Sequence, residues 1–184
     1  SLAPLYRLHP PETCLDMQAS RDCRILDKTF SIQTRAHAMK NHPLTISVMN
    51  EREIHDIFVC WANAEGWNPG LNDAKYFYAQ NRQGFFKGIL NGEVIGCCAA
   101  TIYDDRFAFF GCYIVKSEFR KQGYGMQMTL HRLRYVGDRN IGLDGVLEMC
   151  SRYERIGFRR AHLHIRYRGE ASVHFHFDPH VVEI

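Results

Sequence analysis

The sequence contains no long apolar run and no block of like charges. Its longest apolar stretch, at residues 94–103, is about half of the roughly 20 residues that a membrane-spanning helix requires. Residues 1–10 also lack the layout of a signal peptide, because prolines and charged residues interrupt any apolar core. The net charge of +3 is too small for a protein that coats nucleic acid. We therefore expect a soluble cytoplasmic protein that has neither a membrane nor nucleic acid as a partner.

Paired cysteine motifs are also missing. The seven cysteines are odd in number and irregularly spaced, and no C-x-x-C pair occurs among them. This pattern predicts reduced, buried thiols and no cysteine zinc site. Cys97 and Cys98 are adjacent and would point to opposite faces of a strand, which argues against a disulfide between them.

Two histidine pairs have the spacing of strand residues that share a face. If the strands that carry His162 with His164 and His174 with His176 are neighbours, the four side chains could converge on a zinc ion or form a proton relay. The simpler alternative is polar residues on the solvent face of a hairpin. Because no carboxylate or cysteine spacing supports a metal site, we expect no metal.

The length of 184 residues fits one compact domain with an appended segment. Residues 1–42 show no sustained period, and we interpret them as an N-terminal extension, an irregular leader or a pair of short helices, before a domain at 43–184. Periodicity and turn residues in the domain predict strands at 44–48, 85–90, 93–102, 107–115, 141–147, 161–167 and 172–177, and helices at 50–66, 71–81, 125–136 and 150–156. Three sequential strands with tight turns predict an antiparallel sheet with one well-buried central strand.

Local signals support several of these elements. Asn50 is a candidate N-cap with acidic residues in the first helical turn, and the dipeptide at 91–92 is typical of a hairpin. In the helix at 125–136 the apolar residues form a stripe that His131, Arg132 and Arg134 are expected to flank.

Positive charge is concentrated in residues 116–170, which hold 12 Lys or Arg and 6 Asp or Glu. At the start of this segment a buried strand leads into a basic loop that opens onto a helix. Gly123 and Gly125 would let the backbone approach a pyrophosphate, and Arg120 and Lys121 would neutralise its charge beside the positive end of the helix dipole. The P-loop pattern and the dinucleotide fingerprint are both absent, which leaves the phosphate ligand open at this stage.

Two motifs carry a resemblance to a known family. RKQGYG at residues 120–125 resembles the pyrophosphate loop [RQ]-x-x-G-x-[GA] of the GCN5-related N-acetyltransferases (GNAT), and Val115 stands where the family's preceding strand ends. YERIGF at residues 153–158 resembles the family's Y-x-[KR]-x-G-F element, about 30 residues downstream of the loop. The resemblance covers roughly residues 43–170. Residues 66–70, with 84–86 downstream, further resemble a poorly characterised subgroup.

The resemblance implies the acyl-CoA N-acyltransferase fold, a mixed α/β fold with a mostly antiparallel central sheet flanked by helices. It also implies an acetyl-CoA-dependent N-acetyltransferase, in which the amine of a small molecule or a protein attacks the thioester directly. Tyr153 is implied as the general acid that protonates the departing thiolate. A backbone N–H of Val115, with Ile114 nearby, is implied to polarise the thioester carbonyl. The residues implied to bind acetyl-CoA are Ile114, Val115, Arg120, Lys121, Gln122, Gly123, Tyr124, Gly125 and Met126.

The acceptor side is less defined by the sequence. Trp67 and Asn68 lie in the loop between the first two helices and are the candidates for lining the acceptor cleft. No carboxylate occurs in the strand at 107–115, so the general base stays open. The carboxylates that remain, besides a water chain, are Asp73, Glu118, Asp144 and Glu148.

Two other functions compete with this interpretation. The missing strand carboxylate also fits a non-catalytic acyl-CoA-binding or sensing module of the same fold. A weaker alternative is an interaction domain with the aromatic segment at 67–86 as its partner surface. The acceptor, the acyl-chain preference and the oligomeric state, a homodimer included, are not determined by the sequence.

Overall fold

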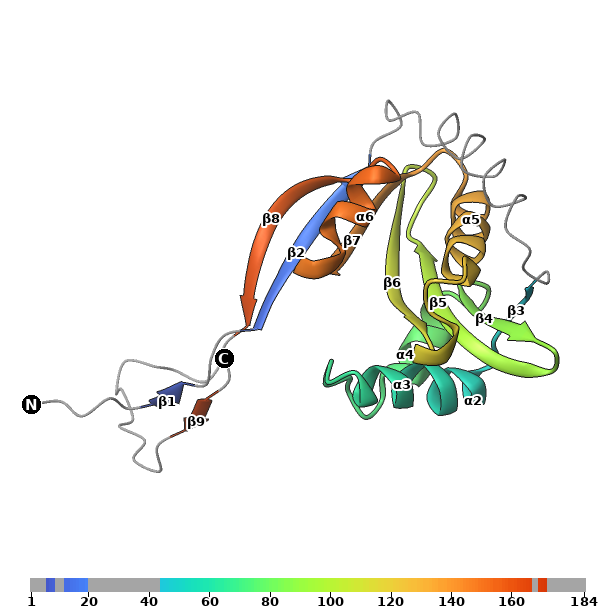
Figure 1. The fold of residues 1–184 in the computed structure, drawn as a ribbon. Helices are drawn as coiled ribbons and strands as arrows, with labels where there is room; N and C mark the ends of the chain where they lie inside the picture. The colour runs from blue at the N-terminus through green and yellow to red at the C-terminus, as the bar shows by residue number, and fades with distance from the viewer. Residues whose placement is uncertain (1–5, 9–11, 20–43, 167–168, 172–184) are drawn as a thin grey trace, which may run out of the picture.

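A computed structural model of the chain describes residues 6–8, 12–19, 44–166 and 169–171 (Figure 1). The described strands form one sheet of seven, in the order β3-β4-β5-β6-β7-β2-β8, and one of two, β1-β9. All neighbours in the larger sheet are antiparallel except β6 and β7. The strands are β1 (Tyr6–Leu8), β2 (Glu12–Ala19), β3 (Thr45–Val48), β4 (Phe85–Leu90), β5 (Glu93–Ile102), β6 (Phe107–Val115), β7 (Asn140–Val146), β8 (Arg159–Arg166) and β9 (Gly169–Ala171).

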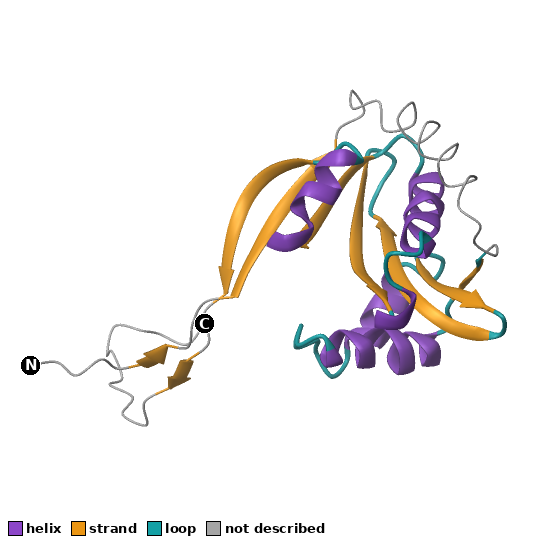
Figure 2. Ribbon diagram, viewed as in Figure 1, coloured by secondary structure: helices purple, strands orange, loops and turns teal. Residues whose placement is uncertain are grey.

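Helical segments connect groups of these strands and flank the sheet (Figure 2). They are α2 (Glu51–Glu53), η1 (Ile54–Val59), α3 (Cys60–Ala64), α4 (Asp73–Gln80), η2 (Ser117–Phe119), α5 (Tyr124–Val136), η3 (Leu147–Met149) and α6 (Cys150–Arg155). The predicted mixed α/β fold with a mostly antiparallel sheet is therefore confirmed. The predicted strand at 172–177 lies outside the described residues.

The hairpin between β4 and β5 forms where the sequence predicts it. Asn91 and Gly92 have φ values of 50° and 85°. Positive φ at both central residues gives a tight turn whose twist matches that of the flanking strands. The turn sets the register that pairs Leu90 with Glu93, and a small shift follows between Gly88 and Ile89.

The first helix begins at the predicted cap. The Asn50 side chain accepts from the Glu53 backbone N–H at 2.9 Å, and the Glu53 carboxylate accepts from the Asn50 backbone N–H at 3.1 Å. This capping box satisfies two N–H groups that a helix end leaves without partners. α2, η1 and α3 form one continuous helical run in which η1 is π-helical, a wider turn that no sequence pattern indicates.

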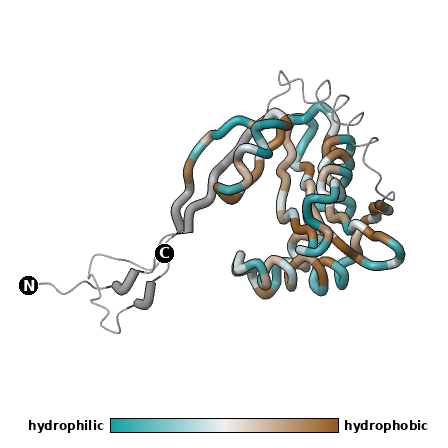
Figure 3. The backbone as a smooth tube through the Cα atoms, viewed as in Figure 1, coloured by the Kyte–Doolittle hydropathy of each residue, from teal (hydrophilic) through white to brown (hydrophobic). Residues whose placement is uncertain are grey.

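The sheet separates two hydrophobic clusters. One contains Met128 of α5 and Phe158, and the other contains Ile54, Phe58 and the residues packed under α2 to α4. Hydropathy along the backbone shows hydrophobic residues following the central strands that lie between these helices (Figure 3). Adjacent Cys98 and Cys97 belong to the first and second cluster, respectively, so they point to opposite faces as predicted.

The N-terminal prediction is wrong where the structure describes it. Tyr6–Leu8 and Glu12–Ala19 are strands, not short helices or an irregular leader, and β2 lies between β7 and β8 in the main sheet. The alternation of Leu15, Met17 and Ala19 with polar residues is a strand signal that the prolines nearby obscured. Pairing with β7 and β8 on both sides, which is a long-range interaction, stabilises this strand.

Two sequence expectations concern membranes and metals. Within the described ranges, no helix has both the length and the apolar character needed to cross a membrane. Nor do the described residues bring together three or more His, Cys, Asp or Glu side chains that could hold a metal ion. The pair His174 and His176 lies outside the described residues, so the two alternatives for the histidine pairs stay open.

Candidate active site

The site begins where two parallel strands separate. β6 and β7 pair from Phe107 with Asn140 as far as Phe110 with Leu143. Beyond this point β6 continues to Val115 and β7 to Val146, and their ribbons diverge (Figure 1). Backbone N–H and C=O groups at a strand edge are strong hydrogen-bonding groups. The final residues of β6 therefore present an edge to the side from which β7 has departed.

A bulge marks the same position on the other edge of β6. Cys97 pairs with Ile114 and Ala99 pairs with Gly111, so β6 has one more residue than β5 between these pairs. Within the bulge Cys112 has a φ of 21°, which is unusual for a residue with a side chain. A bulge bends its strand and increases the local twist. The predicted acetyl-CoA contacts Ile114 and Val115 follow directly after this bend.

The basic loop after β6 is held in a defined conformation. Arg120 donates from Nε to the Val115 carbonyl oxygen at 2.7 Å and from Nη2 to Glu65 Oε1 at 2.7 Å. Lys121 and Gly123 have φ values of 64° and 88°, and α5 starts at the next residue, Tyr124. The loop thus curls onto the N-terminus of a 13-residue helix, where the positive end of the helix dipole favours an anion.

Gly125 has a packing reason to be glycine. A Cβ built on it would lie 2.0 Å from the hydroxyl oxygen of Tyr113, a residue of the diverging part of β6. The Tyr113 side chain therefore reaches from β6 to the first turn of α5. Its burial raises the pKa of Tyr113, although the Arg132 guanidinium and a hydrogen bond with Thr129 act in the opposite direction.

Tyr153 packs over the diverging part of β7. A Cβ built on Gly145 would lie 2.9 Å from its ring, and the ring meets that of Phe158 edge-on with centroids 6.1 Å apart. Tyr153 also lies near enough to Tyr113 to contribute to the raised pKa of that residue. The structure thus brings Tyr153, the loop and the end of β6 together around the point where the two strands separate.

The predicted acceptor residues are placed differently from each other. Trp67 is half-buried against the cluster under α2 to α4, and its backbone N–H donates to the Ala62 carbonyl oxygen at 3.0 Å. Asn68 is exposed, with a φ of 49°. Glu65, two residues before Trp67, bonds to Arg120, and this ion pair joins the loop after α3 to the basic loop.

The four candidate bases occupy different surroundings. Asp73 accepts from the Gly70 backbone N–H at 2.7 Å. Hydrogen bonds from its own backbone N–H and from Ser117 lower the pKa of the exposed Glu118, which weakens it as a base. Glu148 is exposed in η3. Asp144, also exposed, is the candidate within the diverging segment of β7.

The prediction of buried thiols is confirmed for Cys97, Cys98 and Cys150 and is wrong for Cys60, which is exposed. Burial raises the pKa of Cys98 to about 12. A hydrogen bond with the Cys112 thiol, together with burial, raises the pKa of Cys97. Both groups are protonated at neutral pH and are poor nucleophiles and poor metal ligands.

Sequence reasoning missed Arg132. It was expected at the border of the apolar stripe of α5, but its exposed fraction is only 2%. Met128, Arg132 and Val136 are spaced by four residues, and all three lie on the buried side of the helix. This spacing is the sequence signal for the burial of Arg132. It conflicts with the general preference of arginine for the protein surface, on which the expectation was based.

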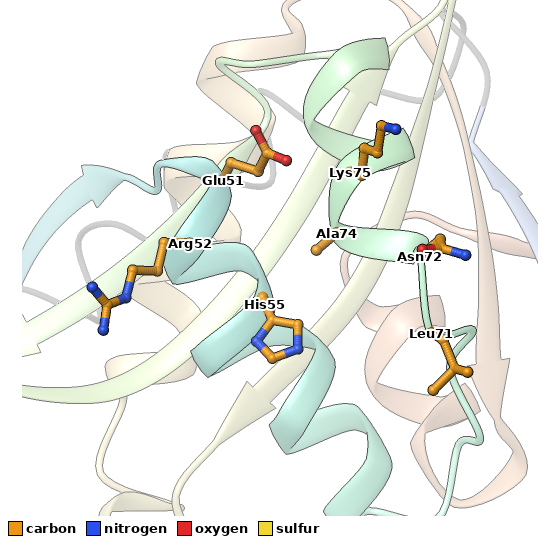
Figure 4. A pocket seen from close by; sticks show the side chains of 7 residues that line it. All are labelled: Glu51, Arg52, His55, Leu71, Asn72, Ala74 and Lys75. Atoms are coloured by element: carbon orange, nitrogen blue, oxygen red, sulfur yellow. The ribbon is translucent and has the colours of Figure 1, made fainter.

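A separate open pocket of about 480 Å³ lies between the first helical run and the start of α4 (Figure 4). Its lining residues are Glu51, Arg52, His55, Leu71, Asn72, Ala74 and Lys75. None of the predicted cofactor or acceptor residues is among them. The pocket is therefore distinct from the site at the diverging strands.

The model of the acetyltransferase (GNAT) family matches residues 51–176 of this chain. The chain belongs to the GNAT acetyltransferase family. A curated relative, the holothin acyltransferase of Pseudoalteromonas sp. (strain SANK 73390), is 32% identical over 120 residues, which is 65% of this chain and 41% of the relative. The chain thus spans about two fifths of that relative's length.

Solved structures of family members share the fold. A putative GNAT acetyltransferase from Novosphingobium aromaticivorans matches with a TM-score of 0.54 and 16% identity, over 89% of this chain and 66% of that one. A GCN5-related glucosamine N-acetyltransferase region of a fungal multi-domain β-N-acetylglucosaminidase matches with a TM-score of 0.58 and 16% identity, over 88% of this chain and 21% of that one. At these identities the likeness supports the fold and not a substrate.

Proposed function

We propose that the protein is an acetyl-CoA-dependent N-acetyltransferase that transfers the acetyl group to an amine of a small molecule or a protein. The observation that carries the proposal is the convergence of three features: the diverging strands β6 and β7, the basic loop at the N-terminus of α5, and Tyr153. Family membership and the curated acyltransferase relative support acyl transfer in general.

The residues present fit coenzyme A. The N-terminus of α5, with Lys121 and Gly123 in left-handed conformations before it, suits the pyrophosphate, and exposed Lys121 adds a positive charge. The edge of β6 at Ile114 and Val115 offers backbone groups to the amide-containing arm of the cofactor. When bound, acetyl-CoA would supply the acetyl group as a thioester that an amine can attack, with the thiolate of coenzyme A as the leaving group.

The proposed reaction requires two proton transfers, one from Tyr153 to the leaving sulfur and one from the amine to a base. Tyr153 is the proposed donor of the proton that the leaving sulfur requires. For the base we favour Asp144. Its neighbour Gly145 faces Tyr153 and α6, so Asp144 faces the opposite side of the sheet, because alternate strand residues point to opposite faces. This arrangement separates the proton donor from the side on which the amine would lose its proton.

The non-catalytic alternative keeps a specific observation in its favour. The β6 strand carries aromatic and aliphatic residues and no carboxylate. If Asp144 does not act as a base, the chain would bind acyl-CoA without efficient turnover. Turnover with an amine panel therefore separates the two functions.

The first experiment measures acetyl-CoA binding by calorimetry and release of free coenzyme A thiol in the presence of amines. We expect binding in the micromolar range, which corresponds to about 8 kcal/mol, and thiol release above the hydrolysis background. Absence of any binding would exclude the proposed function. Binding without amine-dependent release would favour the non-catalytic module.

Two substitutions then test the assigned roles. Tyr153→Phe should lower kcat about 100-fold at unchanged acetyl-CoA affinity, because it removes the proposed proton donor and keeps the ring. Asp144→Asn should lower kcat chiefly at pH values below the pKa of the substrate amine, where the amine must lose a proton before it attacks. Tyr76→Phe, at an exposed tyrosine of α4, is the matched control and should leave kcat unchanged. An unchanged rate for Tyr153→Phe would remove Tyr153 from the mechanism.

A further inference from the structure

Arg132 is a buried cation that the proposed chemistry does not use. It lies on the inner side of α5 with an exposed fraction of 2%. A buried charge is costly unless other groups compensate it. Within the described part of the chain its Nε has no hydrogen-bond partner, so the guanidinium depends on other contacts.

Those contacts all surround the β6 bulge. The guanidinium carbon lies 4.3 Å from the ring centroid of Phe110 and 4.8 Å from that of Tyr113. Its Nη1 donates to the Ala99 carbonyl oxygen at 3.5 Å, a long bond. Phe110 and Tyr113 lie on either side of the extra residue in β6. Ala99 of β5 belongs to one of the two β5–β6 residue pairs that border the bulge.

The two aromatic contacts require the bulge. In a regular strand, residues three positions apart point to opposite faces of the sheet. The extra residue in β6 reverses this relation and places both rings on the α5 side, where Arg132 contacts both. In a strand without the bulge, Tyr113 would point away from α5, and the paired cation–π contact could not form.

Contacts that exist in only one of two strand conformations stabilise that conformation relative to the other. α5 makes further contacts of this kind, because Tyr113 bonds to Thr129 and reaches Gly125. The contacts of Arg132 on α5 therefore stabilise the bulged form of β6 relative to an unbulged strand.

We propose that Arg132 is a positioning residue that holds the bulge of β6 and thereby sets the strand edge at Ile114 and Val115 for the acyl thioester. This role rests on the proposed function, because it takes that edge as the acyl-CoA contact. The effect on the strand itself exists without any ligand and can be measured separately.

The test uses the full chain with Arg132→Met, which keeps much of the side-chain volume, and Arg132→Lys, which keeps the charge without the planar fork. Arg134→Met, at an exposed position of the same helix, is the matched control. Hydrogen exchange by mass spectrometry on the unliganded protein is expected to show about tenfold faster exchange in residues 111–114 for both Arg132 variants, with α2 to α4 unchanged.

Kinetics provide a second readout. Arg132→Met should raise KM for acetyl-CoA about tenfold and lower kcat less, whereas Arg134→Met should change neither. Tyr113→Leu removes one of the two rings and should reproduce the exchange pattern, and it serves as the test if Arg132→Met does not fold. Combining Tyr113→Leu with Arg132→Lys should add little to either single change.

Unchanged exchange in residues 111–114, or an equal acceleration throughout the sheet, would overturn the positioning role. The second result would make Arg132 a general packing residue. If the wild-type chain binds no acyl-CoA, the proposed function fails, while the exchange measurement still decides whether Arg132 holds the bulge.

Discussion

The two edges of β6 differ in how they are used. Its edge toward β5 is paired along nearly the whole strand, with a single bulge. Its edge toward β7 is paired only as far as Phe110 and Leu143. The paired edge joins the central strands into a buried sheet, and the open edge carries backbone groups at the proposed site. One strand therefore serves stability on one side and, in the proposed function, acyl-CoA binding on the other.

The difference suggests that stability and ligand binding can be altered separately. Residues between β5 and the helices are almost fully buried, so a change there should affect global unfolding. Residues of the basic loop and the first turn of α5 are more exposed, so a change there should affect affinity more than stability. The following substitutions test this separation, from the largest expected effect to the smallest.

The largest effect is expected from Ile95→Ala near the start of β5. Ile95 has an exposed fraction of 0%. Removing its side chain from a packed core should lower the free energy of unfolding by about 2–5 kcal/mol, as measured by urea denaturation. While the protein remains folded, its acetyl-CoA affinity should stay near that of the wild type. Leu71→Ala is the control, because Leu71 is 96% exposed and its loss should cost less than about 0.5 kcal/mol. Equal effects of the two changes would contradict the assignment of Ile95 to the core.

A smaller change in stability but a larger change in binding is expected from Gly125→Ala. The new Cβ would meet the Tyr113 hydroxyl at 2.0 Å, so the ring or the helix end must move. We expect a loss of about 1–3 kcal/mol in the free energy of unfolding and at least about tenfold weaker acetyl-CoA binding by calorimetry.

Two comparisons sharpen the Gly125 result. Gly111→Ala is the matched control, because its nearest atom, the Ala99 Cβ, would lie at an ordinary 3.8 Å. Adding Tyr113→Phe to Gly125→Ala removes the colliding oxygen and should restore part of the affinity. No recovery in the double variant would show that the collision is not the cause.

The ion pair between Glu53 and Lys87 joins α2 to β4, a fully paired strand of the sheet that lies away from the proposed site. The bond from Lys87 and the backbone bond from Asn50 lower the pKa of Glu53 despite partial desolvation. Because the folded-state pKa is below the ordinary value of about 4.3, this contribution is complete above that pH and is lost as the pH falls through the lowered pKa. Glu53→Gln should therefore cost about 0.5–1 kcal/mol at pH 7, and the difference from wild type should shrink toward about pH 3 in urea denaturation. A difference that grows on acidification would contradict the direction of the shift.

The smallest effect is expected from Glu65→Gln. Glu65 and Arg120 form an ion pair with side chains that are 38% and 49% exposed. Its loss should change the free energy of unfolding by less than about 0.5 kcal/mol. Because Arg120 is then free for phosphate contacts, acetyl-CoA binding should tighten about twofold at low salt, and high salt should reduce this gain. Asp56→Asn, which breaks the exposed pair with Arg52, should leave the affinity unchanged. Weaker binding by Glu65→Gln would instead assign Glu65 a supporting role in the loop.

Much of the fold was predictable because its signals are local. The cap at Asn50, the turn at Asn91 and Gly92, and the change from a strand to a helical period near Gly125 each depend on neighbours within a few residues. The same holds for the candidate site, since RKQGYG at 120–125 and YERIGF at 153–158 are contiguous motifs. The structure brings these two motifs near one another, and their roles in binding and proton transfer stay predictions.

The features that escaped prediction depend on contacts between distant parts of the chain. β2 is a strand between β7 and β8, a position set by pairing with residues more than 100 positions away. The bulge at Cys112 exists only in relation to β5. Arg132 is buried because two rings of β6 face it, and helical periodicity alone does not show which partner receives a charged side chain.

The sequence by itself determined the family and the order of most elements, and it carries the loop proposed to bind a pyrophosphate, because hydrogen bonding, turn geometry and hydrophobic period act over a few residues. Only the tertiary structure decided where β6 parts from β7 and which side chains surround that point. Strand register and bulges arise from the pairing of separate segments, and the burial of Arg132 follows from that pairing.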